Sequence, residues 1–212
     1  DILGNVSMDF AEKYRPTKLK DCILPKRIKS KLETLVSKKN IGHLIFSGTA
    51  GIGKTATAMA LIKELAPDDS TIINAAQDNS VDYIKNNVVR GMATVSLYGS
   101  KRIILLDEAD GLTENAQKLL RVPMEKMSSI NSLIFCFNDN SKIIDPIKSR
   151  CLEFDFNIKP SEDKEIGKEL LKRFISICKK EKIKLSKQEL QDIIEDNWFD
   201  VRKMLKTIEM EA

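Results

Sequence analysis

The hydrophobic and polar positions along the first part of the chain follow two alternating patterns. Short apolar runs predict strands at residues 43–48, 71–76, 102–107, 132–138 and 151–156. Stretches in which apolar residues recur with helical spacing predict helices over 54–65, 80–94 and 113–127. Several of the short runs are apolar on both faces, which is typical of parallel strands covered by helices on each side. The pattern therefore predicts an α/β fold with a central parallel sheet.

A different pattern occupies the end of the chain. From Ser161 onward the sequence has no strand signal. Lysine-rich amphipathic stretches predict helices near 161–180, 186–196 and 198–211. We therefore expect an α/β domain over 1–157, followed by a small all-α lid domain over 158–212. The hydrophobic fraction of 42% is large enough for both parts to bury a core.

Composition limits the class of protein. Lys and Arg total 35 against 31 Asp and Glu, a formal charge of +4 that permits an acidic partner such as nucleic acid without requiring one. The sequence has no apolar run of about 18 residues and no basic leader before an apolar segment, so we expect a cytoplasmic protein. Wide cysteine spacing and a single histidine disfavour a zinc site. We expect buried thiols in a reducing compartment at Cys22, Cys136, Cys151 and Cys178.

The segment GTAGIGKT follows the first predicted strand and leads into a predicted helix. It matches the phosphate-loop pattern, with the required residues at Gly48, Gly53, Lys54 and Thr55. Glycines let backbone N–H groups converge on phosphate oxygens, while the lysine reaches the terminal phosphates and the threonine hydroxyl reaches Mg²⁺. We therefore predict a nucleotide site for ATP or GTP. Its further contacts come from the same loop and the start of the helix, at Ala50, Gly51, Ile52 and Ala56.

Two acidic residues follow the apolar part of the segment RIILLDEAD. Asp107 is suited to join Thr55 in holding Mg²⁺, and Glu108 is suited to orient or deprotonate an attacking water. The alternative is an Asp-Glu pair that merely caps a strand, and the phosphate loop argues against it. Asn138 ends the next predicted strand, where its amide could bond both the γ-phosphate and the water. A strand-terminating turn explains Asn138 equally well.

Several segments together carry a resemblance to a known family. DEAD at 107–110, Asn138, KIIDPIKSRC at 142–151 and EKYRPTKLKDCILP at 12–25 resemble the AAA+ sliding-clamp loaders, especially the small subunits of replication factor C and the large subunit of T-even-type bacteriophage loaders. The resemblance spans nearly the whole chain. It implies an ATPase that uses Mg²⁺, opens a ring-shaped clamp and places it on primer-template DNA without reading base sequence. It also implies a ring-like, pentameric assembly with other loader subunits at the replication fork, in the cytoplasm or, for a viral protein, the host cytoplasm.

The resemblance also implies where the adenine binds. Tyr14, Arg15 and Pro16 enclose the base in this family, together with Ile23 and its neighbour Leu24. An aromatic ring, an apolar wall and a proline-stiffened backbone suit a flat base. Without the resemblance, the Tyr-Arg-Pro segment would be interpreted as an extended turn.

Further roles follow from the resemblance alone. Arg150 resembles the arginine finger, which acts in trans on ATP bound by a neighbouring subunit, so the isolated chain should hydrolyse ATP poorly. Arg202 resembles the second sensor, which reaches the γ-phosphate from the last helix. Lys85 and Arg90 resemble residues that follow the DNA backbone, and Gln117 resembles a relay between DNA and the catalytic site. On their own, these are ordinary polar or solvated helical residues.

The sequence departs from the family at several points. Ala50 replaces a proline that is frequent in the family's phosphate loop, and we expect nucleotide binding to survive. Pro123 lies within a helical pattern, which predicts a kink or an early helix end near Val122 and puts a subunit contact by Arg121 in question. The family's C-terminal collar domain has no counterpart in these 212 residues, so we expect a fragment or a short protein that assembles differently.

Other functions stay open alongside the clamp loader. Another AAA+ DNA-remodelling motor, of the branch-migration or initiator type, would use the same chemistry, but the EKYRP and SRC segments argue against it. A nucleotide-binding scaffold that does not hydrolyse ATP belongs to a different class. The intact set Lys54, Thr55, Asp107, Glu108 and Arg150 argues against the scaffold. A small-molecule kinase would need an arginine-rich lid and an acceptor site, which the sequence does not indicate.

Overall fold

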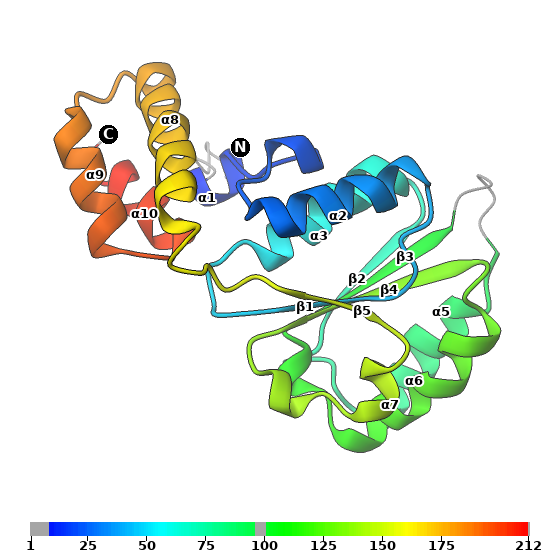
Figure 1. Ribbon diagram of the computed structural model, residues 1–212. Coiled ribbons are helices and arrows are strands. Elements are labelled where there is room, and N and C mark those ends of the chain that lie inside the picture. The colour runs from blue at the N-terminus through cyan, green and yellow to red at the C-terminus, as the bar shows by residue number, and fades with distance from the viewer. Residues whose placement is uncertain (1–8, 96–100, 212) are drawn as a thin grey trace, which may run out of the picture.

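A computed structural model describes residues 9–95 and 101–211 of the chain. At its centre is a five-stranded sheet in which each pair of neighbouring strands is parallel, in the order β2-β3-β4-β1-β5. The strands are β1 (Leu44–Ser47), β2 (Ser70–Asn74), β3 (Arg102–Asp107), β4 (Asn131–Phe137) and β5 (Leu152–Asp155). The prediction of an α/β fold with a central parallel sheet is therefore confirmed (Figure 1).

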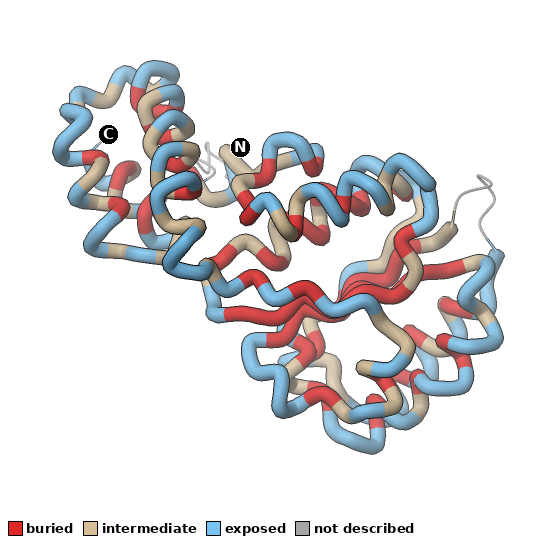
Figure 2. Tube along the Cα trace, viewed as in Figure 1, coloured by how far each residue is buried: buried red, intermediate tan, exposed pale blue. Residues whose placement is uncertain are grey.

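Helices cover both faces of this sheet. One face carries α2 (Lys26–Ser37) and α3 (Lys54–Leu65), and the other carries the helices from α4 to α7 (Figure 1). Alternate residues of β1 point to opposite layers, since Leu44 and Phe46 join the α2–α3 core while Ile45 joins the other. Every residue of β1 and β4 is buried, which explains why these runs have no polar face (Figure 2).

The second face is built from shorter and less regular helices. The stretch predicted as one helix over 80–94 consists of α4 (Val81–Tyr83), a π-helical segment η2 (Ile84–Val89) and α5 (Arg90–Met92). It is followed on this face by α6 (Glu114–Lys126) and α7 (Asp145–Lys148). Single 3₁₀ turns connect other elements, at η1 (Leu19–Asp21), η3 (Ala109–Gly111) and η4 (Asn140–Lys142).

Pro123 does not end the helix in which it lies. We expected a kink or an early end near Val122; helix α6 continues through Pro123 to Lys126, so the early end is wrong and the kink stays a prediction. Proline removes its own N–H but leaves its carbonyl free, and that carbonyl accepts the N–H of Met127 at 2.9 Å. Pro123 is buried, so its packing offsets part of the cost of the missing hydrogen bond. Arg121 lies on the exposed side of the same helix.

The C-terminal part of the described chain is helical. It consists of α8 (Asp163–Glu181), α9 (Lys187–Asp196) and α10 (Val201–Glu209), which share an apolar core of their own. Ser186 begins α9 with a capping box, and Asp200 caps α10. The short N-terminal helix α1 (Phe10–Lys13) packs against α10, and Phe10 is buried in the same core (Figure 1). The domain boundary after residue 157 stays a prediction.

Candidate nucleotide-binding site

The phosphate loop lies between the end of β1 at Ser47 and the start of α3 at Lys54. Gly53 is the N-terminal cap of α3 and adopts the left-handed conformation, with φ of 99°. A Cβ at this position would meet no atom within 4 Å, so the backbone conformation alone requires glycine here. The loop therefore ends in a turn that directs the first N–H groups of α3 toward the cavity, as an anion site needs.

Lys54 makes three hydrogen bonds at the carboxyl edge of the sheet. Its Nζ donates to the carbonyl oxygens of Gly48 at 2.6 Å and Thr49 at 2.8 Å, and to Oδ1 of Asn138 at 3.0 Å. The side chain is buried, and this burial lowers the pKa of Lys54, while the negative charges of Asp110 and Asp107 raise it. If a phosphate entered the loop, its charged oxygens would replace the two carbonyl oxygens as acceptors for Lys54 Nζ.

Thr55 and Asp107 lie together on the same edge. The Thr55 hydroxyl donates to Oδ1 of Asp107 at 2.9 Å, and the same oxygen accepts the N–H of Glu108 at 3.0 Å. Magnesium is usually held in proteins by one or two carboxylates together with substrate phosphates and water. A hydroxyl and a carboxylate oxygen beside a phosphate loop fit this donor set.

Glu108 follows in a strained backbone conformation. Its φ and ψ are 49° and 42°, a left-handed geometry that is uncommon for a residue with a side chain. Such a conformation costs roughly 1–2 kcal/mol relative to a right-handed one. The side chain lines the cavity beside Asp107. Sequence reasoning placed Glu108 at a strand end but did not predict this conformation.

Asn138 reaches the site from the neighbouring strand. Strands β3 and β4 pair directly, so their carboxyl ends lie side by side and bring Asp107 and Asn138 to the same edge. Both residues line the cavity, and Asn138 also accepts the hydrogen bond from Lys54. From the sequence, Asn138 was expected beside Asp107 only if the two strands were neighbours. The structure shows that they are neighbours.

The cavity, about 210 Å³ in volume, extends from the phosphate loop toward the N-terminal segment. Predicted residues that line it are Tyr14, Arg15, Pro16, Ile23, Ala50, Gly51, Ile52, Gly53, Lys54, Thr55, Ala56 and Arg202. Gly48 does not line it but contributes the carbonyl that holds Lys54. Leu24 does not line it either, because this side chain is buried in the α2–α3 core.

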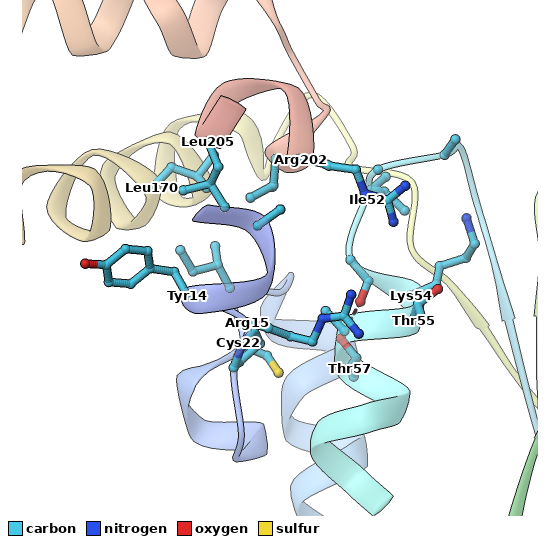
Figure 3. A pocket seen from close by; sticks show the side chains of 18 of the residues that line it. Tyr14, Arg15, Cys22, Ile52, Lys54, Thr55, Thr57, Leu170, Arg202 and Leu205 are labelled. Carbon is cyan, nitrogen blue, oxygen red and sulfur yellow. Dashed lines mark hydrogen bonds between the residues drawn. The ribbon is translucent and has the colours of Figure 1, made fainter. Parts of the chain in front are cut away.

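The Tyr14 hydroxyl points away from the phosphate loop (Figure 3). It donates to Glu181 at the end of α8, and the ring lies edge-on to Phe10 with centroids 5.6 Å apart. Desolvation and the Glu181 carboxylate raise the pKa of Tyr14 to about 12. The phenol therefore stays protonated and links the N-terminal segment to α8.

The cavity also has an apolar wall opposite the N-terminal segment, which the sequence did not predict. It comes from the helical region and includes Leu170 and Leu205 (Figure 3), together with Phe174, Ile177 and Val201. The spacing of the first three gave a signal, since they share one helix face. That face also packs in the helical core, so its pattern cannot distinguish a cavity wall from ordinary core. Ala11, Cys22, Arg173 and Cys136 also line the cavity and were not assigned to it.

The cysteines of the cavity are buried thiols. Burial raises the pKa of Cys22 to about 11 and raises that of Cys136 well above its usual range. Cys151 and Cys178 lie outside the cavity, and all four are free. Among residues 9–95 and 101–211, His, Cys, Asp and Glu side chains form no cluster of three that could hold a metal ion.

Arg202 reaches the site from the start of α10. It lines the cavity, and its positive charge contributes to lowering the pKa of Lys54 (Figure 3). The preceding residue, Val201, donates its N–H to the carbonyl of Gly51 at 3.2 Å. The start of α10 is therefore fastened to the phosphate loop.

Arg150 lies outside the cavity formed by its own chain. Its guanidinium donates to the Pro146 carbonyl at 2.7 Å and pairs with Glu125 of α6. Gln117 is also remote from the cavity and buried, with its Nε2 donating to the Lys142 carbonyl at 2.8 Å and its Oε1 accepting the N–H of Ile144 at 3.0 Å. It therefore ties α6 to the segment that leads to Arg150.

Lys85 lies in the π-helical segment η2 and Arg90 is the first residue of α5, both away from the cavity. The Arg90 N–H donates to the Lys85 carbonyl, which is the hydrogen bond that spans one π turn. Both side chains are exposed. They therefore lie one turn apart on the surface, an arrangement that the predicted regular helix would not produce.

Comparison with known proteins decides the family. Residues 44–160 match the family described as "ATPase family associated with various cellular activities (AAA)". The chain belongs to this family. Membership implies that this AAA chain binds a nucleotide, and the matched residues contain the phosphate loop, Asp107, Glu108 and Asn138.

Similar proteins confirm the resemblance drawn from the motifs. The chain is 36% identical over 205 residues to the replication factor C small subunit of Archaeoglobus fulgidus, covering 94% of this chain and 62% of that protein. It is 35% identical over 205 residues to that of Sulfolobus acidocaldarius, covering 94% of this chain and 61% of that protein. It therefore spans about three-fifths of the length of these curated relatives.

A solved structure shares the fold. A structure of RuvB from Thermotoga maritima aligns with a TM-score of 0.69 and 19% sequence identity, covering 92% of this AAA chain and 64% of that one. Within the described residues, every helix is too short or too polar to cross a membrane.

Proposed function

We propose that the protein is an ATP-hydrolysing subunit of a sliding-clamp loader, which opens the clamp and places it on primer-template DNA during replication. The observation that carries the hydrolysis is the meeting of two hydrogen-bonded pairs at one edge of the sheet, Lys54 with Asn138 and Thr55 with Asp107. The clamp-loading task rests on the replication factor C relatives.

The phosphates of ATP bind over the phosphate loop and the N-terminus of α3. Lys54 leaves the Gly48 and Thr49 carbonyls and donates to phosphate oxygens, while its bond to Asn138 keeps the amide beside the terminal phosphate. Thr55 and Asp107 would hold Mg²⁺, and the ion would supply positive charge that neutralises the phosphates. Glu108 accepts a proton from the attacking water, or orients it, from its place next to Asp107.

The base binds between the N-terminal segment and the helical region. Tyr14, Pro16 and Ile23 line one side of the cavity, and the apolar wall of α8 and α10 lines the other. A slot with apolar walls on two sides suits a planar base. Arg202 lines the same cavity from the start of α10, from which it can sense the γ-phosphate.

Partners complete the hydrolytic site. Arg150 does not line the cavity of its own chain, which supports a role on ATP bound by a neighbouring subunit of a ring-like, pentameric loader. Its guanidinium is held by Glu125 and the Pro146 carbonyl, so the neighbour's phosphates would replace these partners. Lys85 and Arg90 are candidates for contact with the DNA backbone.

The test is the steady-state ATPase rate of the protein in its natural assembly. The clamp and primer-template DNA are added singly and together, with wild type, Glu108→Gln and Arg150→Ala compared. Joint stimulation by clamp and DNA, abolished by either substitution, is expected. Glu114→Gln is a matched control, because Glu114 is exposed on α6, lies outside the cavity and pairs with Lys118.

Other outcomes would point to other functions. An ATPase rate that neither clamp nor DNA changes would contradict clamp loading and favour another AAA+ motor that remodels DNA. ATP binding with no turnover in the assembly would favour a nucleotide-binding scaffold. Recovery of turnover when inactive Arg150→Ala subunits are mixed with inactive Lys54→Ala subunits would locate the arginine at a neighbour's ATP.

A further inference from the structure

Asp110, the last residue of the DEAD segment, forms a two-pronged contact with the end of β4. Its Oδ2 accepts the backbone N–H of Asn138 at 2.7 Å, and its Oδ1 accepts that of Asp139 at 2.9 Å. Both oxygens of one carboxylate are therefore bonded to consecutive backbone donors. Such charge-assisted bonds are shorter and stronger than those between neutral groups.

These two donors need a partner because the strand ends just before them. β4 ends at Phe137 and its neighbour β3 ends at Asp107, so the ladder between the two strands stops there. A carboxylate presents two acceptors in a fixed fork, whereas an amide presents one acceptor and one donor. Asparagine at position 110 would therefore turn an N–H group toward another N–H group.

The turn that carries Asp110 is itself held in place. The Gly111 N–H donates to the Glu108 carbonyl at 3.0 Å, which closes the turn around Glu108. A Cβ at Gly111 would lie 2.3 Å from the Ala75 carbonyl oxygen, so the turn is pressed against the end of β2. The turn is therefore held in place by the end of β2, and Asp110 in this turn can fix the position of the end of β4.

We propose that Asp110 is a positioning residue for hydrolysis, which fixes Asn138 relative to Lys54 and Glu108. This inference rests on the ATP hydrolysis proposed above. Asp110 does not line the cavity, so it acts through Asn138, whose Oδ1 accepts from Lys54 at 3.0 Å. Asp110 therefore connects the turn that carries Glu108 to the end of β4 that carries Asn138.

The test is a double-mutant cycle on ATP turnover in the natural assembly with clamp and DNA. Asp110→Asn is expected to lower kcat by roughly 10-fold to 100-fold, the range of a lost bond to a charged group, with KM for ATP changed by less than about twofold. In the Asn138→Ala background, the same substitution is expected to lower kcat by less than about twofold, because its target amide is gone.

Asp139→Asn is the matched control. It also removes one negative charge next to Asn138, but its carboxylate caps η4 by accepting the Ser141 N–H at 2.9 Å, which asparagine can also do. We expect its kcat to stay within about twofold of wild type. Equal losses in Asp110→Asn and Asp139→Asn would indicate a general effect of charge and overturn the proposal.

A readout that does not depend on activity completes the design. Hydrogen exchange of the Asn138 and Asp139 amides should be faster in Asp110→Asn than in wild type, with the other β4 amides unchanged. Unchanged exchange at these two amides, or equal kcat losses with and without Asn138, would overturn the role of Asp110. Absence of turnover in wild type would instead contradict the proposed hydrolysis, so the two failures are distinguishable.

Discussion

The carboxylate of Asp200 lies where a side chain at Gly51 would begin. A Cβ at Gly51 would be 2.2 Å from Oδ1 of Asp200, and the Gly51 backbone has φ of 77°. Asp200 also caps α10 by accepting the Lys203 N–H at 3.0 Å. The phosphate loop and the helix that begins with Val201 and Arg202 therefore fit together only because position 51 has no side chain.

Gly51→Ala should weaken both folding and nucleotide binding. The left-handed backbone costs roughly 1–2 kcal/mol for alanine, and the clash displaces Asp200 and the start of α10. Urea unfolding measures the loss of stability, and titration with a fluorescent ATP analogue measures the loss of affinity. Gly91→Ala is the control, because a Cβ there meets nothing within 4 Å and alanine favours the helix. Equal effects of the two substitutions would contradict the importance of the Gly51–Asp200 contact.

Asp107→Asn should weaken the dependence of nucleotide affinity on Mg²⁺. Asparagine keeps an oxygen for the Thr55 hydroxyl but loses the charge that attracts the cation. The strengthening of ATP binding by Mg²⁺, measured by calorimetry with the metal and with a chelator, should fall by roughly tenfold while metal-free binding stays similar. Asp68→Asn, exposed and outside the cavity, should behave as wild type. Full Mg²⁺ dependence in Asp107→Asn would exclude this carboxylate as a ligand.

Pro123→Ala should stabilise the protein modestly. Alanine restores an N–H that can donate to the Leu119 carbonyl, and a proline inside a helix costs about 3 kcal/mol. Against this, removing two buried methylene groups costs about 0.8 kcal/mol each. The expected net gain of about 1 kcal/mol would raise the urea midpoint. Val122→Ala, an exposed change in the same helix, should shift stability by less than about 0.5 kcal/mol. A loss of stability in Pro123→Ala would show that ring packing dominates.

His43 should make stability depend on pH near neutrality. Its Nδ1 accepts the Leu133 N–H at 3.0 Å and its Nε2 lies 3.0 Å from the Met124 carbonyl oxygen, so the ring is held neutral. Burial lowers the pKa of His43 below its ordinary value of 6.5. The unfolded chain therefore binds this proton more tightly, and stability is full above about pH 6.5 and is lost as the pH falls toward the lower folded pKa.

The slope can reach about 1.4 kcal/mol per pH unit in this window. Urea unfolding between about pH 5.5 and 7.5 measures it, and the chain has a single histidine, so other side chains with ordinary pKa values contribute little. His43→Asn, which keeps one acceptor and one donor, should be less stable but should lose this part of the slope. An unchanged slope in His43→Asn would assign the effect to other groups.

The sequence by itself determined the features that depend on neighbouring residues. The phosphate loop could be recognised because its ligands lie within one turn and the start of one helix, so their chemistry and spacing are local. The parallel sheet could be predicted because strands covered on both faces leave no polar positions. Glu108 was placed beside Asp107 for the same local reason, although its left-handed backbone was not foreseen.

Only the tertiary structure decided which distant residues meet. The pairing of β3 with β4 brings Asn138 to Asp107 and gives Asp110 its two backbone partners. The docking of α10 on the phosphate loop brings Asp200 to Gly51. Residue spacing predicts which face of a helix or strand is apolar, but not which other element covers it. That choice depends on packing of the whole chain, so these contacts leave no local pattern in the sequence.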